Sequence, residues 1–355
     1  MSGAKHPYRG FPDRQFWARA VSKDYIAVDV GSYPVPLVRT TDKVMTAGSC
    51  FAANLVPYLE KAGIEYLRTE FTHSFFCQIP AENLSYAKFS AGYGNLYTAR
   101  QLLQLLQRSL GMFTPAERHW LCDGRYIDCF RPGLAYAARS EREFGALTAS
   151  HLRAVRRAFT ECDTFIFTLG LTEAWMSSAD GAVFPACPGT IAGEFDPARH
   201  AFVNFTVDEI ISDIRTFVQL LRSINPGVRI ILTVSPVLLV ATAEDRHVLS
   251  ATVYSKSVLR VAAEMISREC EEVYYFPAYE IVTGPQTPEN FFEADRRSVS
   301  PVAIDTVMQA FLSACGAAAG AAPGKDSAAQ PEPSKLEQLA NQLIDIECEE
   351  AAQGL

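Results

Sequence analysis

Apolar positions along the chain follow two alternating patterns. Short, nearly continuous apolar runs, typical of strands buried on both faces of a sheet, occur at 43–48, 163–170, 228–236 and 271–282. Between them, apolar residues recur every three or four positions, which predicts amphipathic helices at 51–63, 97–111, 148–162, 206–227, 255–270 and 300–315. Because strands that alternate with helices form right-handed βαβ units, this pattern predicts a parallel sheet covered by helices on both faces.

The same pattern predicts how the chain is organised. It occupies residues 41–315, which we expect to form one α/β domain. Residues 1–40 are rich in Pro, Arg and aromatic residues and predict an irregular N-terminal arm. After the domain we expect a low-complexity linker at 316–335 and a short acidic amphipathic helix at 336–355, which is a candidate contact for a protein partner.

Composition narrows the class of protein. The net charge is −8 and the pI is near 5.4, so the chain offers no general basic surface and a nucleic-acid partner is disfavoured. No run approaches the roughly 20 apolar residues that span a bilayer, and the N-terminus lacks the apolar core of a signal peptide. The nine cysteines form no CxxC pair and are odd in number, which favours neither a zinc site nor a disulfide framework. We therefore expect a cytoplasmic protein.

Two long segments interrupt the alternation of strands and helices. Residues 112–147 and 176–206 are rich in Gly, Pro and aromatic residues, and long ordered loops of this kind usually shape a site or cover it. In open parallel sheets, ligands bind at the carboxyl ends of the strands. Catalytic or ligand-binding residues are therefore expected in the turns that follow the predicted strands.

The turn after the first predicted strand carries two adjacent nucleophilic side chains. It reads "MTAGSCFAAN", with Gly48, Ser49 and Cys50 where the strand passes into a helix. A nucleophile at such a turn benefits from the N–H groups of the helix N-terminus, which stabilise a thiolate or an oxyanion. The alternative is structural, with Ser49 as a helix N-cap and Cys50 as a small buried residue.

Two further turns carry polar groups suited to an acyl-transfer site. In "FTLGLTEAW", a buried strand ends at Gly170, Thr172 can donate to a developing oxyanion, and Glu173 can orient a base or bind substrate. The alternative is that Thr172 caps a helix that follows. Gly94 and Asn95 form another candidate loop, just before a predicted helix.

Several motifs together resemble those of one family. The stretches "TAGSCFAANL", "FTLGLTEAW", "VSPV", "YSKSVLR" and "YFPAYEIV" are similar to those of the GSCFA-domain family, over roughly residues 40–315. That family is similar to the SGNH/GDSL hydrolases and the related esterases and O-acyltransferases. The resemblance implies a flavodoxin-like three-layer α/β/α sandwich, a nucleophile after the first strand, oxyanion donors from a Gly and an Asn block, and an Asp-x-x-His near the C-terminus.

The resemblance implies specific roles at the first turn. The pattern Gly-Asp-Ser, laid on Gly48, Ser49 and Cys50, puts Cys50 at the position of the nucleophile, with Ser49 as the alternative. The glycine block falls at Gly94 and Asn95, so that backbone N–H groups and the Asn95 side chain would hold the oxyanion.

The later blocks depart from the pattern. The block Gly-x-Asn-Asp falls on Gly170 to Glu173, with Thr172 in place of the usual Asn. The block Asp-x-x-His falls on Asp295 and ends in Ser298, so the histidine is missing. Because a serine hydroxyl cannot accept the nucleophile's proton near neutral pH, the base must come from elsewhere.

Another histidine is expected to act as the base. His247, in the predicted loop after a sheet strand, is the first choice, and His73, ahead of the Gly94 loop, is the second. Asp295 or Glu173 would orient that base or contact the substrate. The alternative for either histidine is a surface or structurally hydrogen-bonded side chain.

A cysteine nucleophile relaxes the need for a histidine. The pKa of a thiol is lowered by a nearby cation, which Lys256 or Arg297 would supply for Cys50. A thiol in place of a hydroxyl is therefore consistent with the missing histidine.

These observations favour a hydrolase or acyltransferase. It would act on ester-linked acyl groups through an acyl-enzyme on Cys50 or Ser49, with a small molecule or an acetylated saccharide as the implied substrate and no metal or organic cofactor implied. The competing class is a non-catalytic glycan- or protein-binding module that kept the pocket. A third alternative is an assembly factor that associates through the acidic C-terminal helix.

Overall fold

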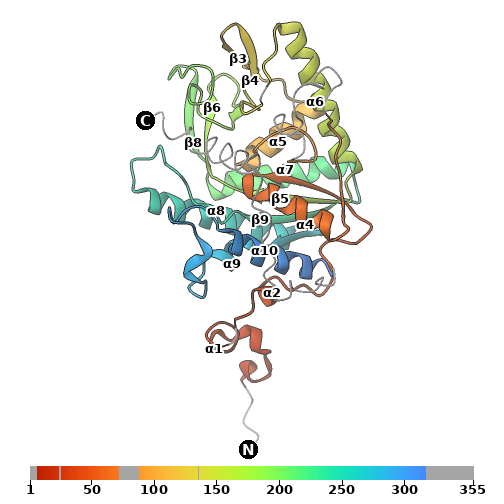
Figure 1. Ribbon diagram of the computed structural model, residues 1–355, viewed down its shortest axis with the longest axis vertical. Helices are drawn as coiled ribbons and strands as arrows, with labels where there is room; N and C mark the ends of the chain where they lie inside the picture. The colour runs from red at the N-terminus through yellow and green to blue at the C-terminus, as the bar shows by residue number, and fades with distance from the viewer. Residues whose placement is uncertain (1–5, 24, 72–87, 135, 317–355) are drawn as a thin grey trace, which may run out of the picture.

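A five-stranded parallel sheet forms the centre of the molecule (Figure 1). The structure, a computed structural model, describes residues 6–23, 25–71, 88–134 and 136–316, so the acidic C-terminal helix, nearly all of the linker and His73 lie outside it. The strands are β1 (Lys43–Gly48), β2 (Glu65–Tyr66), β5 (Thr164–Leu169), β9 (Arg229–Val234) and β10 (Val273–Phe276).

The strand order confirms the predicted flavodoxin-like topology. The strands are ordered β10-β9-β5-β1-β2, which is 2-1-3-4-5 when the sheet strands are counted along the chain. The chain leaves β1 toward β2 on one side and returns to β5 on the other, so the order reverses between β1 and β5. Ligands of doubly wound sheets bind at that reversal, outside the carboxyl ends of the strands.

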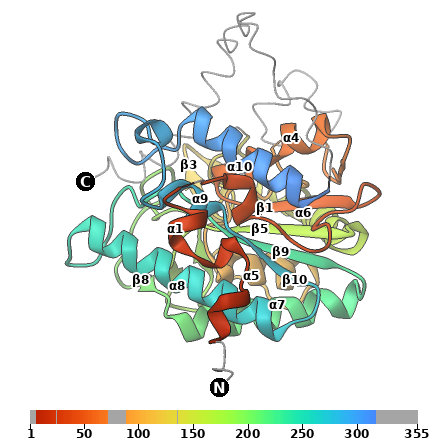
Figure 2. The ribbon, with the colours of Figure 1, turned by 90° about the horizontal axis from the view of Figure 1, so that it is seen from below.

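Side chains that alternate along each strand pack into two separate hydrophobic cores, one on each face of the sheet. Val44, Ile166 and Ile231 point to one face of the sheet, whereas Met45, Phe165 and Ile230, their neighbours in sequence, point to the other. The first face is covered by α3 (Cys50–Ala53), α4 (Leu55–Lys61), α9 (Ala278–Thr283) and α10 (Pro301–Ala314). The second is covered by α5 (Ala99–Ser109), α6 (Glu141–Glu161), α7 (Val207–Ile224) and α8 (Val248–Glu269). In Figure 2 the sheet lies between these two layers of helices, with α4 and α10 on one side and α7 and α8 on the other. The predicted three-layer α/β/α sandwich is therefore confirmed.

Two predicted elements differ from the structure near prolines. The predicted helix 51–63 is divided into α3 and α4 at Asn54, and Pro57 lies in the first turn of α4, where its missing N–H would have no intrahelical acceptor. The apolar run 271–282 was predicted as one strand, but β10 ends at Phe276 and the residues after Pro277 form α9. Because proline cannot donate to a strand ladder, it ends β10 there.

The two long segments contain small sheets of their own. Residues 112–147 include a hairpin of β3 (His119–Cys122) and β4 (Arg125–Asp128) and the start of α6. The second segment contributes to an antiparallel sheet of β6 (Glu173–Ser177), β7 (Val183–Phe184) and β8 (His200–Asn204). Thr172 therefore precedes a strand, and the alternative that it caps a helix is wrong.

The described part of the N-terminal segment contains four short helical turns and no strand before β1. They are η1 (Pro7–Gly10), η2 (Asp13–Gln15), α1 (Trp17–Ala20) and α2 (Ala27–Val30), and α1 projects below the body of the molecule in Figure 1. A further turn, η5 (Glu289–Phe291), lies ahead of α10. No helix within the described ranges is long and apolar enough to cross a membrane.

Candidate active site

Gly48 ends β1 with a backbone that only glycine adopts easily. Its φ is +147°, and a Cβ at this position would lie 2.7 Å from the Thr168 Cβ and 2.8 Å from the Thr168 carbonyl oxygen on β5. The Gly48 carbonyl also accepts a hydrogen bond of 2.8 Å from the Leu96 N–H. The turn into α3 is therefore held tightly between β5 and the loop that precedes α5.

Ser49 is the N-cap residue of α3, but its hydroxyl does not cap the helix. The side chain is 5% exposed, and its Oγ has no hydrogen-bond partner in the part of the chain that the structure describes. Buried polar atoms are almost always hydrogen-bonded, so the Ser49 Oγ is available for a contact with a bound molecule or a water. The backbone of Cys50 begins α3, while its side chain lies outside the described structure.

The loop before α5 joins the ends of the two central strands. The Tyr97 carbonyl accepts hydrogen bonds from the N–H groups of Gly170 (3.0 Å) and Leu171 (2.9 Å), just beyond the end of β5. The neighbouring Leu96 contacts Gly48 at the end of β1, as described above. The turns that carry Ser49 and Gly170 are thereby fixed relative to each other at the reversal of strand order.

Other hydroxyls without a described partner lie at the same edge of the sheet. Thr168 and Thr233 are paired across β5 and β9, one residue before each strand ends, and both are buried with unpartnered Oγ1 atoms. Thr172 is fully buried; its N–H donates to the Ser255 Oγ, but its own Oγ1 has no partner among the described residues. The carboxyl edge of the sheet is thus unusually rich in unsatisfied donors and acceptors.

A cavity of about 130 Å³ opens beside Ser49. Its walls come from the ends of β1, β5 and β9 and from the loop after β9. The lining residues are Ser49, Tyr97, Gly170, Leu171, Glu173, Pro185, Ser235, Val237, Leu238, Leu239, Val240, Ala241 and Arg297. This cavity therefore lies where the topology places ligands.

Two charged side chains line this cavity. Glu173 accepts a hydrogen bond of 2.8 Å from the Thr242 hydroxyl, and burial raises the pKa of its carboxyl. Arg297 donates from Nε to the Leu238 carbonyl at 3.1 Å. The cavity is thus lined by one acidic group, the Glu173 carboxyl with its raised pKa, and one basic group, the Arg297 guanidinium.

Lys256 supports the turn at Gly170 that lines the cavity. Its side chain, 1% exposed on α8, donates from Nζ to the Gly170 carbonyl at 2.7 Å. Since a buried lysine is stable only with polar partners, this bond fixes the turn after β5. Lys256 is not among the residues that line the cavity.

The Gly94–Asn95 loop lies on an adjoining cavity. That cavity, about 50 Å³, is lined by Gly94 and Asn95 and shares Tyr97 and Pro185 with the cavity at Ser49. Gly94 has a φ of +68°, which allows the sharp turn there. The predicted oxyanion loop therefore borders the cavity at Ser49, with Tyr97 and Pro185 as lining residues common to both cavities.

Comparison with known proteins assigns the family. The model of the GSCFA family matches residues 43–311. The chain belongs to the GSCFA family. No curated protein matches it. A crystal structure of a carbohydrate esterase family 3 from Talaromyces cellulolyticus is similar, with 10% sequence identity, a TM-score of 0.32, and coverage of 76% of this chain and 94% of that one.

In this GSCFA protein, His247 is not among the residues that line the cavity at Ser49. As predicted, it belongs to the loop after β9, where it is the last residue and the N-cap of α8; its side chain is exposed, and its Nδ1 accepts a hydrogen bond from the Leu249 N–H at 3.1 Å. It matches the structural alternative, a surface histidine with a local hydrogen bond. None of the histidines within the described ranges lines the cavity at Ser49.

Asp295 and Ser298 satisfy each other in an exposed turn. The Asp295 carboxylate accepts from the Ser298 hydroxyl (2.5 Å) and from the N–H groups of Arg297 and Ser298 (both 2.9 Å). Partial burial opposes ionisation, but these hydrogen bonds outweigh it and lower the pKa of the carboxyl. Of this block, Arg297 is the residue that reaches the cavity. The described residues contain no group of His, Cys, Asp and Glu side chains placed to hold a metal ion.

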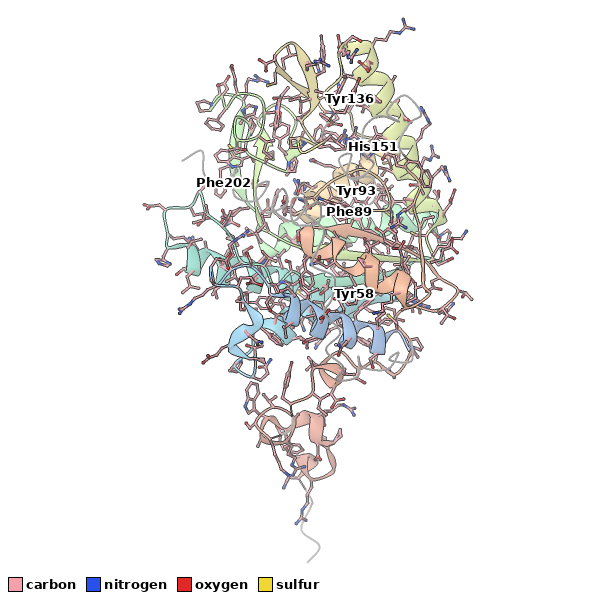
Figure 3. The ribbon with its side chains drawn as sticks, in the orientation of Figure 1. Tyr58, Phe89, Tyr93, Tyr136, His151 and Phe202 are labelled. Carbon is pink, nitrogen blue, oxygen red and sulfur yellow. The ribbon has the colours of Figure 1, made fainter. Side chains whose placement is uncertain are left out.

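A buried acid–base pair positions the loop that carries Gly94. Glu70 Oε2 accepts from the Gly92 N–H and from the His151 Nδ1, each at 2.7 Å, and Arg131 lies 3.8 Å from the same carboxylate. His151 extends inward from α6 and is 1% exposed (Figure 3). Burial alone would raise the pKa of Glu70, but these three partners lower it to about 2.

We expect Glu70→Gln to destabilise the fold by about 3 kcal/mol at neutral pH, because a shift from 4.5 to about 2 corresponds to that energy. A lowered pKa stabilises the native state above pH 4.5, and this contribution is lost as the pH falls from 4.5 to about 2. Urea unfolding across this range should show the loss in the wild type and a flatter dependence in the variant. Glu161→Gln, which removes an exposed pair with Arg157, should cost less than about 1 kcal/mol. Equal losses in the two variants would refute the role of Glu70.

Sequence reasoning missed most of the cavity wall. Tyr97, Leu171 and Pro185 lie in turns, and nothing in their local pattern indicates which way they face. The segment 237–241 carried a usable signal, because "VLLVA" stays apolar after β9 has ended at Val234. An apolar run outside the sheet favours contact with other apolar groups or a ligand, and here all five residues line the cavity.

Proposed function

We propose that this GSCFA protein cleaves ester-linked acyl groups, as a hydrolase or an acyltransferase, through a covalent acyl-enzyme on Ser49. The observation that carries the proposal is the Ser49 hydroxyl. It is buried, has no hydrogen-bond partner among the described residues, and lines a cavity at the reversal of strand order. A hydroxyl in that situation is available to a substrate carbonyl rather than to the fold.

Glu173 is proposed as the proton acceptor. Ser49 Oγ attacks the ester carbonyl carbon while its proton passes to the Glu173 carboxylate. The tetrahedral intermediate then expels the alcohol, which takes that proton, and leaves the acyl group on Ser49. Water or an acceptor hydroxyl repeats the sequence, giving the free acid or the transferred ester and restoring Ser49.

The choice of Glu173 over His247 rests on position and pKa. Glu173 shares the cavity with Ser49, whereas His247 is exposed at the start of α8. Burial raises the pKa of Glu173, which makes the carboxylate a better base than an exposed one.

The oxyanion is proposed to bind the Cys50 backbone N–H and the Asn95 side chain. As the first residue of α3, Cys50 has an N–H without an intrahelical acceptor. Asn95 belongs to the loop that is tied to the end of β1 through Leu96. The alcohol side of the ester is proposed to be a saccharide or small-molecule hydroxyl, as the resemblance to esterases implies.

Ester turnover and its pH dependence test this mechanism. With p-nitrophenyl acyl esters, we expect saturable hydrolysis whose kcat/KM falls as the pH drops through the raised pKa of Glu173, because the base must be ionised. Glu173→Gln should lower kcat/KM by about 10²- to 10⁴-fold and abolish that pH dependence.

Glu293→Gln is the matched control. Glu293 is exposed in the turn beside Asp295 and lies outside the cavity, so its removal should leave both the rate and the pH profile unchanged. If no acyl ester or thioester is turned over while a glycan binds, the protein is the non-catalytic binding module and the proposed mechanism is refuted.

A further inference from the structure

The loop after β9 gives the Ser49 cavity an apolar wall. Val237, Leu238, Leu239, Val240 and Ala241 follow one another along it. Leu171 and Pro185 add apolar surface from other loops. Most of the groups that a bound molecule would contact are therefore hydrocarbon, although the Ser49 hydroxyl also lines the cavity.

Hydrogen bonds hold this wall in place at both ends and in the middle. The Val237 N–H donates to the Ser235 Oγ at 3.3 Å, and Arg297 Nε donates to the Leu238 carbonyl at 3.1 Å. At the far end, the Thr242 hydroxyl donates to Glu173 at 2.8 Å. A wall fixed in this way is formed before ligand binds, as is usual for small-molecule sites.

The cavity volume sets the size of the group that fits. At about 130 Å³ it is close to the roughly 150 Å³ of an apolar cavity that accommodates benzene, a six-carbon molecule. A two-carbon acetyl group would leave most of the hydrocarbon wall without contact. We propose that the cavity binds the acyl part of the substrate, and that this acyl group is apolar and of about six carbons, such as hexanoyl or benzoyl.

This inference rests on the proposed function, and the two fail in different ways. Each methylene moved from water to an apolar wall is worth about fourfold in binding. Over a series of p-nitrophenyl esters, we therefore expect kcat/KM to rise by at least about 100-fold from acetyl to hexanoyl. A preference for acetyl would overturn the inference and leave ester hydrolysis standing.

Filling the cavity supplies the matched test. Ala241→Phe adds a ring at the cavity wall and should abolish the preference for hexanoyl while acetyl is still hydrolysed. Ala198→Phe, the same change at an exposed position outside the cavity, should keep the preference. Equal chain-length profiles in the two variants, with unchanged melting temperatures, would overturn the inference.

A binding measurement covers the case in which no ester is turned over. Hexanamide and benzamide, titrated calorimetrically into the wild type, should bind more tightly than acetamide. Ala241→Phe should lose this binding and Ala198→Phe should retain it. Absence of binding by the wild type would overturn the inference independently of catalysis.

Discussion

Ser49→Ala is expected to lower kcat/KM for ester hydrolysis by at least about 10³-fold, because loss of a nucleophile leaves only the contribution of binding and oxyanion stabilisation. The substitution removes a hydroxyl that has no partner among the described residues, so the fold should be unaffected. The measurement is steady-state kinetics on an acyl ester, together with mass spectrometry of Ser49 after rapid quenching to detect the acyl-enzyme.

Ser235→Ala is the matched control for this experiment. Ser235 is a buried serine on the same cavity, but its Oγ accepts a hydrogen bond from the Val237 N–H and is therefore engaged by the fold. We expect a loss of no more than about tenfold. Cys50→Ala should retain turnover. If Cys50→Ala abolishes activity and Ser49→Ala retains it, the nucleophile is the cysteine that the sequence pattern favours, and the assignment to Ser49 is refuted.

Gly48→Ala is expected to destabilise the native state by roughly 3 kcal/mol, the largest effect on stability that we predict for a single methyl group. Part of the cost is the backbone, since a φ of +147° is strained for any residue with a Cβ. The rest is steric, because the added carbon would lie 2.7 Å from the Thr168 Cβ and 3.0 Å from the Ala52 Cβ. Neither neighbour has a flexible side chain that can move away.

Gly63→Ala separates the two contributions. Gly63 also has a positive φ, +75°, but nothing lies within 4 Å of an added Cβ. We expect a loss of about 1 kcal/mol there, from the backbone alone. Urea titrations of both variants measure the difference, and equal losses would mean that the contact with Thr168 relaxes without cost.

The fold was predictable because its main elements have strong local patterns. β1, β5 and β9 are continuous apolar runs, and the run at 43–48 matches β1 residue for residue. The helix predicted at 97–111 corresponds to α5, which begins directly after Thr98, whose capping box with Gln101 is present. Boundaries were less predictable: β10 ends at Phe276, ahead of Pro277, and α8 begins at Val248, seven residues earlier than its apolar pattern indicated.

The site was predictable in position but not in composition. The rule that ligands bind at the carboxyl ends of strands selects the turns at Ser49 and Gly170, and those turns meet in the structure. Which side chain of a turn faces the cavity depends on how neighbouring loops pack, and no periodicity encodes this. His247 and Arg297 show the difference, since both lie in segments expected near the site and only Arg297 lines the cavity.

The pairing of β1 with β5 also determines when the site can exist. Gly48 lies opposite Thr168, so the two halves of the site come from distant parts of the chain. During synthesis, the turn that carries Ser49 leaves the ribosome long before the strand that completes it. A nascent chain that ends before β5 contains the GSCFA motif but has no cavity beside it. Assembly of the site is therefore a long-range folding event, and its rate should follow formation of the central sheet rather than of the local turn.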